Sequence, residues 1–255
     1  MIRRTRLRKP SFRPYKKPLI LVGVRQNMDD IISLAKYHNY EVIGILDQYY
    51  YGNTDKFFDI PIIGNERWLL DSTNTIAQKW INNSWFINST WWTGRQYLNT
   101  KGLDLEQVRK DRIRILNDSK AKLANLIHPD AKIPYKNKIQ LGNGIMIMGE
   151  AFIGSYTSIG NHSYIDWQAN ISKYSKIGQG CIIGHRVNLA NYEVKDYVRI
   201  GVGANLIGSK KDSTFAVVGE NSVVHVGAVA VDDIPANHIR TFTNKTLPRT
   251  KLCEQ

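Results

Sequence analysis

Residues 153–189 read IGSYTSIGNHSYIDWQANISKYSKIGQGCIIGHRVNL, with an aliphatic residue at every sixth position. A period of six matches neither the 3.6-residue repeat of a helix nor the two-residue alternation of a strand. It is typical of short strands joined by corners, three of which close one triangular turn of a parallel β-helix. Residues eighteen apart then lie on top of one another. The pattern therefore predicts that Ile153 stacks on Ile171, and Ile171 on Leu189.

The six-residue repeat extends over about residues 133–231 and has two irregularities. One residue is missing between Leu189 and Val194. Residues 208–214 interrupt the repeat after Ile207, which predicts a loop that leaves the β-helix. Loops carried by a rigid scaffold often have a functional role.

The composition of the 255 residues indicates a globular protein with one large or two ordinary domains. No apolar run reaches the ~18 residues of a membrane span, and no secretory signal follows the first charged residues. Two cysteines, Cys181 and Cys253, are too few for a disulfide framework or a zinc cluster. We therefore expect a reduced, cytoplasmic protein without a metal site.

The net charge of +13 is concentrated at the N-terminus. Residues 1–17 hold no acidic residue and supply over half of the excess, through Arg3, Arg4, Arg6, Arg8, Lys9, Arg13, Lys16 and Lys17. Such a segment can be a solvated tail, which we favour, or attract an anionic membrane surface weakly. No DNA-binding motif follows it, so we expect no nucleic-acid partner.

The residues after the tail alternate between strand and helix patterns. Residues 18–23 are typical of a buried parallel strand, residues 28–35 of an amphipathic helix, and residues 41–47 of a second strand. This order predicts a βαβ unit of the nucleotide-binding type. Further strands are predicted at residues 60–64, at an edge because of Pro61, and at 84–88. Helices are predicted from Asn65 and over residues 104–116.

Five aromatic residues gather between these elements: Trp80, Trp85, Trp91, Trp92 and Tyr97. They can form a stacking surface for a base or a sugar ring. Packing of the small domain against the β-helix or a neighbouring subunit is the interpretation that we favour.

The order of these parts resembles the sialic-acid and bacillosamine O/N-acyltransferases of bacterial surface-glycan pathways. That family joins a small Rossmann-like N-terminal domain to a left-handed hexapeptide-repeat β-helix. The resemblance rests on residues 19–23, 41–47, 60–64, 126–131 and 218–237. It implies an α/β plus all-β chain with four parts: a basic tail (1–17), a Rossmann-like nucleotide-sugar-binding domain (18–124), a β-helix acyltransferase domain (125–240) and a C-terminal tail (241–255).

The resemblance implies transfer of an acyl group from acetyl-CoA to an amino group or hydroxyl of a nucleotide-linked sugar. The sites of such enzymes lie in crevices between the β-helices of a homotrimer, with a histidine as general base. The implied coenzyme residues here are Asn191, Gly203, His225 and Gly227. The implied nucleotide residues are Gly23, Arg25 and Asp47.

The chain departs from this family at its most important position. Lys173 occupies the place of the histidine base, and Ile182 that of a second histidine. A lysine is normally a cation, and it accepts a proton only where burial or a like charge disfavours that form. His185, beside Arg186, is the best alternative base. The candidate catalytic residues are therefore Lys173 and His185.

Other departures affect the rest of the site. The turn after the first strand retains only Gly23, and Asn191 replaces a glycine expected near the acetyl group. His128 is expected to cap or pack, and His162 and His225 to be surface or capping residues. His162, His185 and His225 lack the spacing of a metal site. A neutral amine needs a base less than a hydroxyl does, so N-acylation is favoured. The alternative is a catalytically silent trimeric scaffold or sugar-nucleotide-binding relative.

Overall fold

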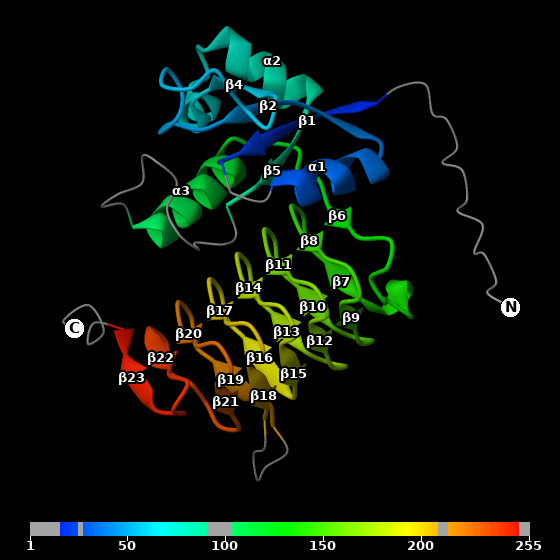
Figure 1. Cartoon of the computed structure of the whole chain (residues 1–255), viewed down its shortest axis with the longest axis vertical. Coiled ribbons are helices and arrows are strands. Elements are labelled where there is room, and N and C mark those ends of the chain that lie inside the picture. The colour runs from blue at the N-terminus through cyan, green and yellow to red at the C-terminus, as the bar shows by residue number, and fades with distance from the viewer. Residues whose placement is uncertain (1–15, 25–27, 91–103, 209–213, 250–255) are drawn as a thin grey trace, which may run out of the picture.

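A computed structural model describes residues 16–24, 28–90, 104–208 and 214–249 of the chain. Over these residues the chain forms an α/β unit followed by a parallel β-helix, with the helix α3 between them (Figure 1). Within the described residues, no helix is both long enough and apolar enough to cross a membrane. Residues 1–15 of the basic tail and Arg25 lie outside the described residues, whereas Lys17 of the tail begins the first strand.

The α/β unit is built on one five-stranded sheet with the order β3-β4-β2-β1-β5. Its strands are β1 (Lys17–Val22), β2 (Tyr40–Leu46), β3 (Lys56–Phe57), β4 (Ile60–Gly64) and β5 (Trp85–Asn88). β1, β2, β4 and β5 are parallel, as predicted. The edge position predicted for β4 is wrong, because the short β3 pairs with it antiparallel and Pro61 lies opposite Lys56.

Helices cover both faces of this sheet (Figure 1). They are α1 (Met28–Tyr37), the 3-10 helix η1 (Glu66–Leu70), α2 (Thr75–Asn83) and α3 (Leu105–Asp118). Polar side chains cap three of them: Asn65 accepts from the Arg67 amide, Asn74 from the Ala77 amide, and Asp104 from the Glu106 and Gln107 amides. Sequence analysis did not predict α2, which buries only Ala77.

The β-helix consists of three parallel sheets that form the sides of a prism (Figure 1). We call them sheets I, II and III. Sheet I contains β7 (Gln140–Leu141), β10 (Ser158–Ile159), β13 (Lys176–Ile177), β16 (Tyr192–Val194) and β19 (Ala216–Val218). Sheet II contains β6 (Leu126–Ile127), β8 (Met146–Ile147), β11 (Tyr164–Ile165), β14 (Ile182–Ile183), β17 (Arg199–Ile200), β20 (Val223–Val224), β22 (His238–Arg240) and β23 (Thr246–Pro248). Sheet III contains β9 (Phe152–Ile153), β12 (Asn170–Ile171), β15 (Asn188–Ala190), β18 (Asn205–Ile207) and β21 (Val229–Ala230). A second 3-10 helix, η2 (Lys136–Lys138), precedes β7.

The predicted stacking of aliphatic residues is confirmed. Ile153 pairs with Ile171, and Ile171 pairs with Leu189; all three are buried. Turns of such a prism share one continuous apolar core, and each turn covers the next. The glycines that follow many aliphatic residues have a steric reason, because a Cβ at Gly154 would collide with the backbone of Lys173 in the next turn.

Both irregularities of the repeat appear in the pairing of sheet I. Ile177 pairs with Val194, one residue early, so the corner between β15 and β16 is shortened. Val194 then pairs with Val218, which leaves residues 208–215 as an insertion between β18 and β19. Of this insertion, residues 209–213 lie outside the described residues.

Residues 241–249, which were predicted to belong to a tail, include the strand β23. β23 pairs antiparallel with β22 and extends sheet II beyond the last turn. Arg249 then donates to Glu106 Oε2 at 2.6 Å and to the Asn221 carbonyl at 2.6 Å. This hairpin therefore caps the β-helix and ties it to α3.

Sheet II faces the α/β unit. Its outward residues Met146, Tyr164 and Ile182 are buried with the core of the small domain. Arg109 of α3, only 1% exposed, donates to the carbonyl of Gly180 at a corner of the β-helix. The two units therefore share a continuous apolar and polar interface, which fixes how they lie relative to each other.

His162 joins the same interface and makes it sensitive to acid. It is fully buried; its Nε2 contacts Asn117 Oδ1 at 2.9 Å, and its Nδ1 has no partner among the described residues. Burial lowers the pKa of His162 from 6.5 to about 4. The unfolded chain therefore binds the proton first, and stability is lost as the pH falls from 6.5 towards 4.

We expect His162→Gln to reduce this acid sensitivity. Glutamine keeps an amide donor for Asn117, and Gln168 already adopts the same left-handed backbone elsewhere in the chain. Between pH 7 and pH 4 the wild type should lose roughly 3 kcal/mol more than the variant. Urea unfolding at several pH values measures this difference. If the free energy of unfolding falls equally with pH in the two proteins, the prediction is wrong.

Candidate functional site

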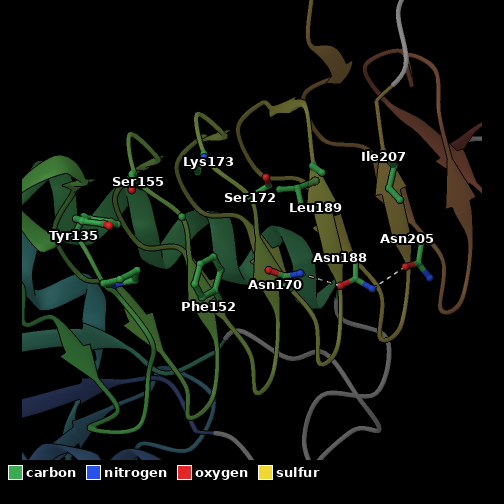
Figure 2. Close-up of a pocket in the computed structure, with 13 residues that line it drawn as sticks. Tyr135, Phe152, Ser155, Asn170, Ser172, Lys173, Asn188, Leu189, Asn205 and Ile207 are labelled. Carbon is green, nitrogen blue, oxygen red and sulfur yellow. Dashed lines mark hydrogen bonds between the residues drawn. The ribbon is translucent and has the colours of Figure 1, made fainter.

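A groove of about 540 Å³ runs along sheet III (Figure 2). Most of the side chains that line it are apolar or small, and its polar side chains lie on the strands and at one corner. It is lined by Pro134, Tyr135, Phe152, Gly154, Ser155, Asn170, Ser172, Lys173, Asn188, Leu189, Ala190, Asn205 and Ile207. A concave apolar groove with a few polar groups is typical of a small-molecule site.

Three asparagines form a ladder along the groove (Figure 2). Asn170 Nδ2 donates to Asn188 Oδ1 at 3.4 Å, and Asn188 Nδ2 donates to Asn205 Oδ1 at 2.8 Å. The ladder ends where Asn205 Nδ2 donates to the Gly203 carbonyl at 3.2 Å. Each amide retains hydrogen-bonding capacity, so the ladder offers donors and acceptors along the length of the groove.

Lys173 lies at the edge of the groove between sheets III and I, directly after β12. Its side chain is exposed. Asn191 lies at the same edge, one turn further along, where its carbonyl accepts from the Ala216 amide at 3.0 Å. The structure therefore brings together Lys173 and Asn191.

The other predicted residues of the β-helix lie at the opposite edge of sheet III, where sheet II ends. The Gly203 amide donates to the His185 carbonyl at 2.8 Å, and His225 and Gly227 follow at the next turn. A Cβ at Gly203 or Gly227 would meet open space, and both have a left-handed backbone, with φ of 68° and 67°. His185 and Lys173 therefore do not meet within one chain.

The predicted nucleotide residues Gly23 and Asp47 lie at the carboxyl end of the N-terminal sheet. Asp47 is only 1% exposed. Its Oδ2 accepts from the Val24 amide at 2.8 Å and from Arg112 Nη2 at 2.9 Å, and its Oδ1 accepts from the Tyr49 amide at 2.9 Å. The carboxylate thus holds the chain segments after β1 and β2 together and lies beneath the surface of that edge.

Arg112 of α3 is the centre of this network, and sequence analysis missed it. Its Nε donates to Glu66 Oε1 at 2.8 Å, opposite the bond to Asp47. Burial by itself lowers the pKa of Arg112, but the carboxylates of Asp47 and Glu66 outweigh this effect and raise it above the usual value. The sequence contained a sign that Arg112 is buried. It lies four residues after Val108, and residues four apart lie on the same face of a helix.

Arg112 explains why residue 23 is a glycine. A Cβ added at Gly23 would collide with the guanidinium of Arg112 and with Thr90, and its φ of 98° is itself unfavourable for other residues. The glycine that remains in the turn after β1 therefore makes room for a buried cation from α3.

Two further predictions concern residues outside the groove. His128 packs as expected, since its Nδ1 accepts from the Asp130 amide at 3.2 Å and its ring lies 4.9 Å from that of Trp167. Of the aromatic cluster, Trp80 stacks on Trp68, while Trp85 contacts Tyr40 in the other core of the small domain. Trp91, Trp92 and Tyr97 lie outside the described residues. No group of three metal-ligating side chains occurs in the described part of the chain.

No family model and no curated protein matches the sequence. Several solved structures match the fold. A point variant of GDP-perosamine N-acetyltransferase from Caulobacter crescentus, in complex with CoA and GDP-perosamine, has a TM-score of 0.70 at 20% identity, covering 90% of this chain and 96% of that chain. The acetyltransferase domain of PglB from Neisseria gonorrhoeae, in complex with acetyl coenzyme A, has a TM-score of 0.69 at 20% identity, covering 92% and 100%.

WeeI from Acinetobacter baumannii has a TM-score of 0.67 at 12% identity, covering 91% of this chain and 100% of that chain. These likenesses extend over nearly the whole of each chain, so they include both the α/β unit and the β-helix. They confirm the predicted left-handed parallel β-helix. At such low identity they establish the fold, whereas the activity has to be argued from this chain's own residues.

Proposed function

We propose that the chain is a CoA-dependent acyltransferase, which transfers an acetyl group from acetyl-CoA to the amino group of a nucleotide-linked sugar. The observation that carries the proposal is the groove on sheet III, with Lys173 at its edge and the asparagine ladder along its floor. Support also comes from the fold shared with a sugar N-acetyltransferase solved with CoA and GDP-perosamine. Surface-polysaccharide biosynthesis is the process in which such a sugar is used.

The groove suits a reaction that depends on positioning. The neutral amine of the sugar attacks the thioester carbonyl, the new C–N bond forms, and the C–S bond breaks. The departing thiolate takes the proton that the nitrogen loses. Holding the two reactants in line supplies much of the rate enhancement, and amide donors near the carbonyl oxygen stabilise its developing charge. Lys173 would pair with an anionic group of the substrate, and Asn191, Gly203, His225 and Gly227 would hold the coenzyme.

A homotrimer would bring the two candidate catalytic residues together. Lys173 and His185 lie at opposite edges of sheet III within one chain, so a neighbouring β-helix must supply the second of them. Mixing Lys173→Ala and His185→Ala chains by unfolding and refolding would then regenerate some intact sites. Activity of the mixture above that of either variant alone supports a shared site. No recovery in a mixture that sedimentation shows to be trimeric would contradict it.

The α/β unit would act as the Rossmann-like holder of the nucleotide. Ligands of parallel sheets bind outside the carboxyl ends of the strands, which is the edge that Gly23, Asp47 and Arg112 organise. Arg25, which follows β1 in the sequence and lies outside the described residues, would pair with the phosphates. We place the reaction in the cytoplasm, where acetyl-CoA and nucleotide-linked sugars are available, with the basic tail as a weak membrane contact.

An assay of CoA release tests the activity directly. Purified protein is incubated with acetyl-CoA and UDP-, dTDP- or GDP-linked amino sugars, and the same sugars without the amino group serve as controls. We expect thiol release with at least one amino sugar and none with its deaminated counterpart. Release that does not depend on the amine would contradict N-acylation. No release with any sugar, and no thermal stabilisation by acetyl-CoA, would favour a silent scaffold.

The silent alternative has one observation in its favour. The exposed Lys173 stands where the resembled family has its histidine base. A scaffold of this kind would still bind a nucleotide-linked sugar at the α/β unit. Stabilisation by the sugar nucleotide without stabilisation by acetyl-CoA is the result that distinguishes it.

A further inference from the structure

One corner of the β-helix, where sheet II passes into sheet III, carries an equivalent residue in five successive turns. In each turn the backbone amide of this residue donates to a carbonyl of the turn below, as Arg186 does to Trp167 at 3.0 Å and Gly203 to His185 at 2.8 Å. All five have a left-handed backbone, with φ between 56° and 68°. We call them the corner column, which consists of Glu150, Gln168, Arg186, Gly203 and Gly227.

The three lower members of the corner column hold one another. Gln168 Nε2 donates to Glu150 Oε2 at 2.8 Å, and Arg186 Nε donates to Gln168 Oε1 at 2.8 Å. Arg186 is exposed, and the partner of its Nε is an uncharged amide. Among the described residues, its two Nη atoms have no hydrogen-bond partner. The guanidinium is therefore held in place while it keeps donors for an anion.

The two upper members are glycines that the chain itself does not require. A glutamate, a glutamine and an arginine adopt the left-handed backbone in the three turns below. A Cβ at Gly203 or Gly227 would meet no other atom of the described chain within 4 Å. Gly180 at the corner between sheets I and II is different, because a Cβ there would collide with the ring of Tyr197. The corner column thus changes from long side chains to bare backbone directly above the guanidinium.

The bare part of this corner adjoins the groove. β15 and β18 begin two residues after Arg186 and Gly203, and their first residues, Asn188 and Asn205, line the groove (Figure 2). Asn205 Nδ2 also donates to the Gly203 carbonyl at 3.2 Å, so the asparagine ladder ends at the corner. A glycine lets a ligand approach the backbone closely, and a guanidinium matches the geometry of phosphate oxygens. The two features lie one turn apart along the same edge.

We propose that Arg186 binds a phosphate group of a ligand whose adjoining part lies against the backbone of Gly203 and Gly227. The assignment of this ligand to CoA rests on the proposed function, in which the two glycines hold the coenzyme. The nucleotide-linked sugar is the other source of phosphate. Binding does not require any transfer reaction, so this proposal can fail while the chain proves to be an acyltransferase, and it can hold if no transfer is found.

Two variants of opposite design test the site by calorimetry with CoA, GDP and UDP. Arg186→Gln removes the charge, and Gly203→Gln places a side chain over the bare backbone, at a conformation that Gln168 already adopts one position lower in the column than Arg186. Each should weaken binding of the same ligand about tenfold, the usual effect of losing a hydrogen bond to a charged group. Arg114→Gln is the matched control, because it removes another exposed arginine and should leave every affinity unchanged.

The salt dependence of binding shows whether the charge of Arg186 acts on a phosphate. Added salt screens exposed charges, so it should weaken binding to the wild type more than binding to Arg186→Gln. Weaker binding of CoA assigns the phosphate to the acyl donor, and weaker binding of GDP or UDP assigns it to the acceptor. Unchanged affinities for all three ligands in folded Arg186→Gln or Gly203→Gln would overturn the proposal. So would a changed oligomeric state with unchanged affinities, because the bare corner would then be a contact between copies.

Discussion

Lys173→His is expected to raise the rate of acyl transfer by about 100-fold, the lower end of the usual contribution of a positioned general base. Lys173 lines the groove from the corner after β12, and its side chain is exposed. An imidazole at the same position is neutral for much of the time near pH 7 and can accept a proton from the attacking amine. Turnover with saturating acetyl-CoA and amino sugar, measured from pH 6 to pH 9, gives the comparison.

The pH profile distinguishes a base from a merely smaller side chain. In Lys173→His the rate should rise with pH and level off above the pKa of the new imidazole. Lys173→Gln removes the charge without adding a base, and it should not reproduce either the gain or this profile. If Lys173→His is slower than the wild type while Lys173→Gln is equally slow, the ammonium group itself is needed, and Lys173 acts by pairing with the substrate.

The β-helix could be predicted from the sequence because its core repeats in register. Ile153, Ile171 and Leu189 have to meet at the prism axis, and a change in spacing between Leu189 and Val194 is visible as a missing residue. The helix α2 was missed because its apolar stripe is short: Ala77, Trp80 and Ile81 recur at i, i+3 and i+4 and pack against one core, but Ala77 is the member of the stripe that is fully buried. Ile76 is 57% exposed, and Ala77 is the residue that the helix buries.

The candidate site was less predictable for a physical reason. The family resemblance placed Lys173 at the position of the histidine base. The groove beside it depends on which faces of the strands remain uncovered, and Asn170, Asn188 and Asn205 were not singled out. The network at Asp47 depends on Arg112, which is 65 residues distant in the chain. A charged residue on the buried side of a helix is the only local sign of such a partner, and the sequence does not show which carboxylates it will meet.

The helix α3, which carries Arg112, joins the two halves of the molecule, because it contacts both of them. From one side of the helix Arg112 binds the loops at the end of the N-terminal sheet. From other positions, Arg109 donates to Gly180, and Glu106 accepts from Arg249. A change at Arg112 should therefore affect the stability of the whole chain and not only the nucleotide edge.

Arg112→Met is expected to destabilise the protein by about 3–5 kcal/mol, because it leaves the carboxylates of Asp47 and Glu66 buried without their cation. Arg114→Met is the matched control, since Arg114 lies on the same helix with its side chain 66% exposed, and it should change stability by less than about 0.5 kcal/mol. Urea unfolding at pH 8 measures both losses. Adding Asp47→Asn and Glu66→Gln to Arg112→Met removes the two uncompensated charges, and the triple variant should recover part of the loss. If Arg112→Met is no less stable than Arg114→Met, the guanidinium does not offset the buried carboxylates, and packing alone holds α3 against the sheet.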